Sequence, residues 1–157
     1  MSLRSLKRGF TLIELLLVIG IIAILAAIVI VAINPTKQLG DARNAQRRSD
    51  VNTVLNAVYQ FSIDHDGKFP GSMSGAVFTK GTVYNICKSS PSAACGDLAK
   101  NELALDTLAP TYLVSLPFDP SGTSGTGTSY RLVMSGNNRI TISAPMAEQN
   151  VTISVTR

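Results

Sequence analysis

Residues 7–15 read Lys-Arg-Gly-Phe-Thr-Leu-Ile-Glu-Leu and open an apolar run that continues to residue 33. Only Thr11, Glu14 and Gly20 interrupt the apolar side chains between residues 10 and 33. As a helix, this run would be about 36 Å long, which is enough to cross the hydrocarbon core of a bilayer. An acidic side chain inside that core is energetically costly, so Glu14 indicates a functional requirement rather than a plain membrane span.

The net charge of the chain comes mostly from its first nine residues. The chain has 157 residues and a formal net charge of +4. Arg4, Lys7 and Arg8 precede the apolar run, and the rest of the chain carries 11 basic and 10 acidic side chains. This nearly neutral body argues against a generic nucleic-acid-binding domain.

A basic start before an apolar run is typical of a targeting or membrane segment whose positive end stays in the cytoplasm. An ordinary secretory signal has an apolar core of about 7–15 residues, followed by a small-residue cleavage site. Here the apolar core is longer, contains Glu14 and lacks a clear site of that kind at its end. A plain membrane anchor is the alternative, but it leaves Glu14 without a role.

The helical pattern is interrupted at Asn34-Pro35 and then resumes with a different face. Proline removes a backbone donor and clashes with the preceding turn, so we expect a kink or break near Ile33. A stripe of apolar side chains follows at helical spacing, namely Val51, Val54, Leu55, Val58 and Phe61. The opposite face carries polar side chains, namely Arg43, Arg47, Arg48, Asp50, Asn52 and Asn56. Arg47 and Arg48 are expected to belong to a solvated helix face rather than to a DNA-binding patch. Gly67 and Pro70 favour the end of this second helix.

A helix from residue 10 to about residue 66 would be about 85 Å long. A globule of this size cannot bury that length, so the apolar half must be surrounded by a bilayer or by a bundle of identical helices. The chain is therefore predicted to consist of a leader (1–9), an apolar helix (10–34), an amphipathic helix (35–66), a connecting region (67–110) and a sheet (111–157).

The C-terminal third predicts an antiparallel sheet of about three to four strands that packs on the apolar stripe. Strands are expected where apolar and hydroxyl residues alternate, at 129–134, 139–143 and 151–155. Shorter patterns predict strands at 77–78 and 82–86, and one or two helical turns within 98–108. The predicted fold class is α+β, with a long kinked N-terminal helix packed on this small sheet.

The two cysteines, Cys87 and Cys95, are eight residues apart in a stretch that resembles a loop. If this part of the chain lies outside the membrane, their even number favours a disulfide between them. The alternative is two inert buried thiols. Zinc would need more ligands than these thiols and His65 can supply, and His65, at the end of the second helix, is expected to be solvated.

The basic leader residues, Gly9 and the stretch from Phe10 to Leu15 resemble the prepilin processing motif of type IV pilins and type II secretion pseudopilins. The length of the leader, the glycine, the phenylalanine and the acid all fall at the spacing of that family. Residues 63–70 and 112–122 also resemble the helix exit and the loop before the terminal strands of these proteins, whereas residues 71–109 carry no resemblance.

The resemblance implies that a membrane peptidase cleaves between Gly9 and Phe10, with Lys7 and Arg8 in the leader, and methylates the new amine of Phe10. The apolar helix would first hold the subunit in the cytoplasmic membrane, with the leader inside and the C-terminal domain outside. It would then enter the core of a filament outside that membrane. The implied partners are other pilins, the peptidase and methyltransferase, a platform protein and an assembly ATPase.

Glu14 gains a role from this resemblance. In the filament, its carboxylate would pair with the cationic amine of Phe10 on a neighbouring subunit and set the axial register. The alternative is a contact within its own subunit, with its own Phe10 amine or with Thr11. Asp119 lies near a loop that binds calcium in some relatives, but calcium needs 6–8 oxygen ligands and few acids are near, so no metal site is predicted.

The chain shows no nucleophile with a matching base, no phosphate-binding glycine loop and no metal cluster, so neither an enzyme nor a cofactor is predicted. The predicted function is a structural subunit of a type IV pilus-like filament. Two alternatives stay open: a pseudopilin of a type II secretion system and, in a different class, a membrane-anchored extracytoplasmic binding domain. DNA capture by a competence pilus gains little support from the nearly neutral body.

Overall fold

The structure is a computed structural model, and it describes residues 9–70, 79–88, 101–122 and 127–157. The chain divides into two compact units, Met1–Leu39 and Gly40–Arg157. The second helix, α2, begins in the first unit and continues through the second.

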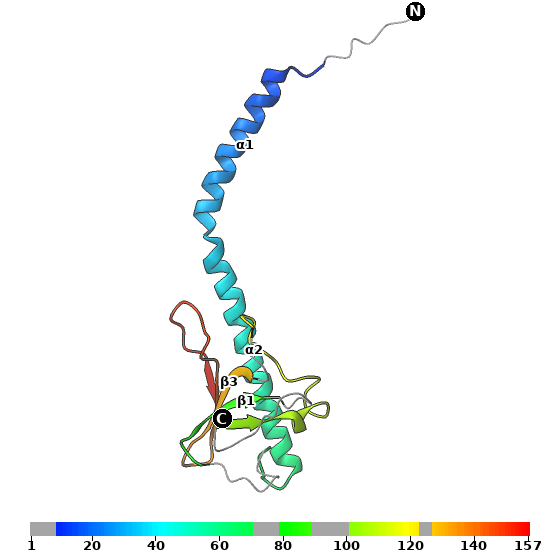
Figure 1. Cartoon of the computed structure of the whole chain (residues 1–157), viewed down its shortest axis with the longest axis vertical. Coiled ribbons are helices and arrows are strands. Elements are labelled where there is room, and N and C mark those ends of the chain that lie inside the picture. The colour runs from blue at the N-terminus through cyan, green and yellow to red at the C-terminus, as the bar shows by residue number, and fades with distance from the viewer. Residues whose placement is uncertain (1–8, 71–78, 89–100, 123–126) are drawn as a thin grey trace, which may run out of the picture. The chain divides into compact units, whose positions relative to one another are not determined.

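Helix α1 runs from Leu12 to Ile33 (Figure 1). Its residues are mostly apolar, and none of its side chains is buried. Among the described residues, it is the helix whose length and composition would allow it to cross a membrane. Asn34 follows with left-handed backbone angles (φ 40°), and α2 (Pro35–Asp64) starts at the next residue. The Lys37 N–H donates to the Asn34 side-chain oxygen at 3.4 Å, so Asn34 ends one helix and caps the next. The break therefore lies where Pro35 predicts it.

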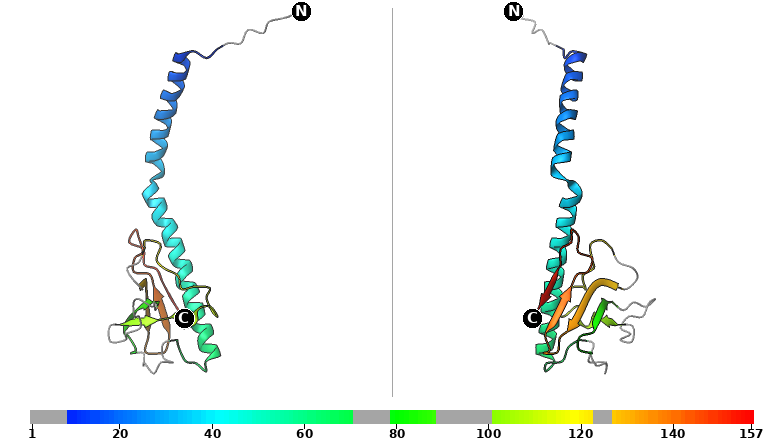
Figure 2. Two further views of the ribbon diagram at one scale, coloured as in Figure 1. Left: turned by 45° about the vertical axis from the view of Figure 1, so that its right-hand side comes forward. Right: turned by 90° about the vertical axis from the view of Figure 1, so that its left-hand side faces the viewer.

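The second unit contains a five-stranded sheet with the strand order β2-β1-β3-β4-β5 (Figure 2). The strands are β1 (Val83–Cys87), β2 (Glu102–Ala104), β3 (Gly127–Met134), β4 (Ile140–Ser143) and β5 (Ser154–Thr156). β1 and β2 are parallel, whereas the other neighbouring pairs are antiparallel.

The predicted α+β fold class is confirmed, but the sheet is larger than predicted and parallel at one edge. Within 98–108, where helical turns are predicted, the described residues form β2 and a short 3₁₀ helix, η3 (Asp106–Leu108). β2 pairs with β1 from Asn85 opposite Glu102 to Cys87 opposite Ala104. Three residues are too few to show a strand period of their own, so this non-local pairing decided their structure. The predicted strand at 77–78 lies outside the described residues.

The core lies between α2 and the sheet, as predicted. The apolar stripe of α2 is buried, and its members are Val51, Val54, Leu55, Val58 and Phe61. They share one cluster with sheet residues that include Tyr84, Ile86, Leu132, Ile140 and Ile142. In β3 every second side chain is buried, from Thr128 to Met134, because alternate residues of a strand point to opposite faces. Gly67 (φ 79°) then donates its N–H to the Ser62 carbonyl at 2.8 Å and closes the end of α2.

Candidate functional site

The described part of the N-terminal motif begins at Gly9, and both Gly9 and Phe10 are exposed. Thr11 has extended backbone angles and is the N-cap of α1. The Glu14 N–H donates to Thr11 Oγ1 at 3.3 Å, while the N–H and hydroxyl of Thr11 donate to Glu14 Oε2 at 2.9 and 2.7 Å. This capping box satisfies backbone donors that the first turn of a helix leaves unpaired. Glu14 therefore contacts Thr11 of its own subunit, which is one of the two roles expected of it.

The capping box occupies only half of the Glu14 carboxylate. Both hydrogen bonds from Thr11 reach Oε2, and within the described residues Oε1 has no hydrogen-bond partner. A carboxylate offers about four acceptor positions, so Oε1 can receive a cation from outside the chain. The box begins at Thr11, so a cut between Gly9 and Phe10 would leave it intact. Lys7 and Arg8 lie outside the described residues.

A second polar arrangement lies inside the C-terminal unit and is centred on Arg47 of α2. Its guanidinium donates from Nε and Nη2 to the two carboxylate oxygens of Asp119, at 2.7 and 2.9 Å. Nη2 also donates to the Ser121 hydroxyl at 2.5 Å, and Nη1 donates to the Asn44 side-chain oxygen at 3.0 Å. The side chains of Arg47 and Asp119 are both 0% exposed, so this is a fully buried two-pronged ion pair.

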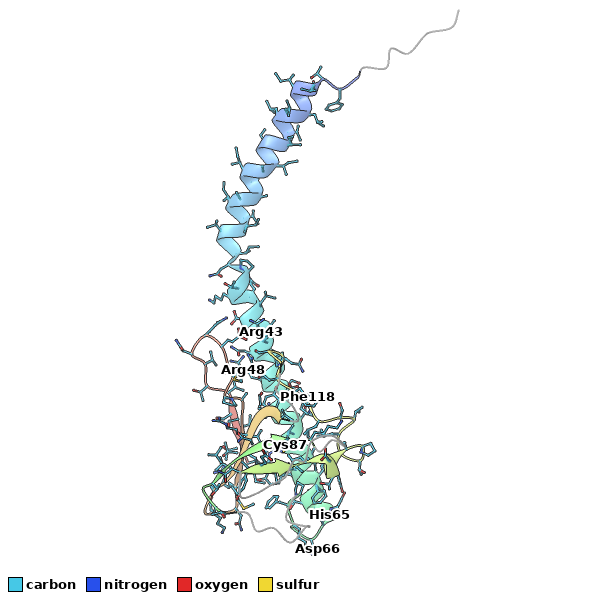
Figure 3. The ribbon with its side chains drawn as sticks, viewed as in Figure 1. Arg43, Arg48, His65, Asp66, Cys87 and Phe118 are labelled. Carbon is cyan, nitrogen blue, oxygen red and sulfur yellow. The ribbon has the colours of Figure 1, made fainter. Side chains whose placement is uncertain are left out.

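The turn that contains Glu148 packs on the same helix through ion pairs and hydrogen bonds. Arg43 donates to both Glu148 carboxylate oxygens, at 2.5 and 2.7 Å, and Arg47 Nη1 reaches Oε1 at 3.1 Å. The Asn44 amide exchanges two hydrogen bonds with the backbone of Glu148, each 3.0 Å long. A side chain at Gly40 would begin 2.8 Å from the Gln149 amide nitrogen, so the glycine lets this turn approach α2. Figure 3 shows Arg43 on the part of α2 that contacts this turn, and His65 just beyond the C-terminal end of the helix.

The charges in this arrangement favour ionised carboxylates. Burial alone would raise the pKa of Asp119, but the hydrogen bonds from Arg47 and the Ser121 N–H outweigh burial and lower it. The hydrogen bonds from Arg43 are the main cause that lowers the pKa of Glu148 to about 2. The hydrogen bonds to Asp119 in turn raise the pKa of Arg47. Both acids are therefore ionised at neutral pH.

A neighbouring polar contact joins α2 to β3. Tyr130 donates its hydroxyl to Asp50 Oδ2 at 2.6 Å, and the Gln46 amide donates to Oδ1 at 2.8 Å. Burial and this hydrogen bond raise the pKa of Tyr130, so the phenol stays protonated. Among the described residues, every buried side-chain nitrogen and oxygen has a hydrogen-bond partner. The head thus buries several polar groups without leaving one unsatisfied.

The prediction that Arg47 lies on a solvated face was wrong, and Asp50, on the same polar face, is buried as well. Arg47 is buried because the segments around Asp119 and Glu148 cover it, and Asp50 is buried beneath Tyr130 of β3. Arg48, the next residue, is exposed as expected. The available signal was the spacing of Arg43, Arg47 and Asp50, which places three charged side chains on one side of the helix beside the apolar stripe.

The remaining predicted residues lie apart from this arrangement. His65 is not simply solvated, because its ring stacks on Phe61 with centroids 3.9 Å apart and its Nδ1 lies 2.8 Å from the Phe61 carbonyl oxygen. The part of the chain that is described contains no group of three or more His, Cys, Asp or Glu side chains placed to hold a metal ion. Cys87 is buried at the end of β1. Cys95 lies outside the described residues, so their pairing stays a prediction.

Known proteins match both the N-terminal motif and most of the chain. Residues 4–30 match the prokaryotic N-terminal methylation motif. The chain is 28% identical over 134 residues to the type II secretion system core protein G of Pectobacterium carotovorum subsp. carotovorum, which covers 84% of this chain and 70% of that protein. No solved structure gives a significant match. The chain therefore shares its N-terminal motif with type IV pilin-like prepilins, and over most of its length it is distantly similar to a component of a type II secretion system.

Proposed function

We propose that the chain is a structural subunit of a type IV pilus-like filament, cut after Gly9, methylated on Phe10 and polymerised through α1. The main support is that the methylation motif coincides with a helix whose side chains are not buried in the part of the chain that the structure describes. The 22 residues of α1 would extend about 33 Å, and none of their side chains is buried within the chain. A helix of this kind needs lipid or other helices around it.

In this proposal α1 has two successive environments. It first crosses the cytoplasmic membrane, with the basic leader on the cytoplasmic side. After processing it moves into a bundle of α1 helices from other subunits. Cleavage and methylation would be carried out by the peptidase and methyltransferase. Assembly would be driven by the ATPase together with the platform protein.

Cleavage would create a cationic partner for Glu14. The new amine of Phe10 is cationic, and methylation keeps that charge. Oε2 of Glu14 is already engaged by Thr11, so Oε1 is the atom that would receive the amine of a neighbouring subunit. A buried carboxylate paired in this way is tolerated, whereas an unpaired one is not, so the pair would select a single axial register.

Mass spectrometry of sheared surface material tests the processing. We expect a mature N-terminus at N-methyl-Phe10, and an uncleaved Met1 terminus in the membrane would refute the proposal. The matched variant for the register role is Glu14→Gln, because glutamine keeps the capping box but removes the charge. We expect loss of filaments from Glu14→Gln and normal filaments from Thr11→Val, which keeps the charge. Normal filaments from Glu14→Gln would show that the charge does not set the register.

A pseudopilin of a type II secretion system is the second candidate, and the similarity to the type II secretion system core protein G favours it. Deletion of the gene separates the two candidates. Loss of surface filaments with normal protein secretion would favour the pilus, and the reverse would favour the pseudopilin. A membrane-anchored binding domain would instead keep its leader and stay monomeric.

A further inference from the structure

The turn that contains Glu148 also carries a feature that filament assembly does not explain. Asn150-Val151-Thr152 has the pattern Asn-x-Thr, in which the asparagine amide is an acceptor for N-linked glycans. The one other asparagine followed two positions later by a hydroxyl residue is Asn34, and there Pro35 occupies the middle position that must not be proline. The sequence therefore contains a single competent acceptor pattern.

The structure presents this pattern in an accessible form. Asn150 and Thr152 are both exposed, and Asn150 has left-handed backbone angles (φ 57°) in the turn before β5. Within the described residues, neither the Asn150 amide nor the Thr152 hydroxyl makes a side-chain hydrogen bond. An acceptor pattern is used where the chain is exposed and not committed to regular structure. We propose that Asn150 is a site of N-linked glycosylation.

The reaction would be a glycosyl transfer from a polyprenyl-diphosphate-linked oligosaccharide. The Asn150 amide nitrogen would form a bond to the anomeric carbon of the first sugar and lose one proton. The bond between that carbon and the diphosphate oxygen would break, and the lipid diphosphate would leave with the electron pair. No oxidation or reduction takes place.

The transferase would recognise Thr152 through its hydroxyl. Glu148 stands two residues before Asn150. In the folded head, Arg43 and Arg47 hold that carboxylate. These ion pairs hold the turn on α2 and leave Asn150 and Thr152 exposed, so the transferase can act on the folded head.

Mass spectrometry of the native full-length protein tests the inference directly. Trypsin cleaves after Arg139 and Arg157, so residues 140–157 form one peptide that contains Asn150. We expect this peptide to carry the mass of an oligosaccharide. The added mass should be lost completely in Asn150→Asp and in Thr152→Val, and it should be retained in Thr152→Ser. Aspartate tolerates left-handed backbone angles, so Asn150→Asp should fold. This variant also keeps every hydroxyl group of the peptide, so an O-linked sugar would remain.

The inference rests on the proposed topology, in which the C-terminal unit lies outside the cytoplasmic membrane. Protease treatment of intact cells tests that topology separately. An unmodified peptide from a head that the protease can digest would overturn the glycosylation alone, whereas a protected head would overturn the proposed function as well. Added mass that persists in Thr152→Val would also overturn the assignment to Asn150.

Discussion

Replacing Arg47 by methionine removes the charged centre of the head and leaves most of the side-chain volume. Methionine would make none of the five side-chain hydrogen bonds of Arg47. It would also leave the carboxylate of Asp119 fully buried without a cation. Removal of one partner of a buried pair costs about 3–5 kcal/mol. Because a domain is typically stable by only about 5–15 kcal/mol, this is a large fraction of the total.

Thermal unfolding of the full-length chain in detergent, followed by near-ultraviolet circular dichroism of the head tyrosines, measures the effect. The head spans Gly40–Arg157. For a domain of this size, 1 kcal/mol shifts Tm by about 4 °C. We therefore expect Arg47→Met to lower Tm by about 12–20 °C at pH 7.

Two matched variants separate the charge effect from simple loss of packing. Arg48→Met changes the neighbouring exposed arginine and should shift the unfolding free energy by no more than about 0.5 kcal/mol. The double variant Arg47→Met/Asp119→Leu removes both charges and should recover most of the loss, because apolar replacements of a whole buried pair are often neutral. An unchanged Tm in Arg47→Met, or a double variant no better than the single one, would refute the reasoning.

Three further predictions concern the same head. Since the pKa of Glu148 is about 2 and that of Asp119 is also lowered, the unfolded chain binds more protons than the folded head below about pH 4–5. The unfolding free energy from urea titrations should therefore be constant from about pH 7 to 5 and fall towards pH 2, with a shallower fall in Glu148→Gln. Tyr130→Phe should cost about 1.5–3 kcal/mol in the same titrations, because the hydrogen bond to the Asp50 carboxylate is lost. Gly40→Ala should leave the unfolding free energy nearly unchanged, because the flexible end of Gln149 can move and alanine favours the helix by about 1 kcal/mol. Gly40→Leu should instead push the turn away from α2, so that the backbone amide of Glu148 exchanges its hydrogen faster.

The parts of the fold that depend on local pattern were predictable. The apolar stripe from Val51 to Phe61 has helical period, so its buried face follows from the sequence alone. Pro35 cannot continue a regular helix, so the break beside Asn34 follows from covalent geometry. The alternation in β3 and β4 likewise identified two of the central strands.

The parts that depend on pairing between distant segments were not predictable. Arg47 and Asp119 are 72 residues apart, and the sequence around either residue does not indicate that the two form an ion pair. An arginine on a helix is usually exposed to solvent, so this general rule predicted exposure for Arg47, which is buried. Edge strand β2 is similar, because its backbone pairing with β1 and not its own composition makes it a strand.

Two acids in this chain are satisfied in different ways, and this difference separates assembly from folding. Asp119 finds its cation within its own head, whereas Glu14 keeps one oxygen open and lies outside that head. Glu14→Gln should therefore abolish filaments and leave the Tm of the head unchanged. Arg47→Met should lower the Tm while filaments still form at temperatures below the new midpoint. Electron microscopy of sheared material and unfolding of the same preparations would measure both properties. A Glu14 variant that destabilises the head would show that the two sites are coupled and would contradict this separation.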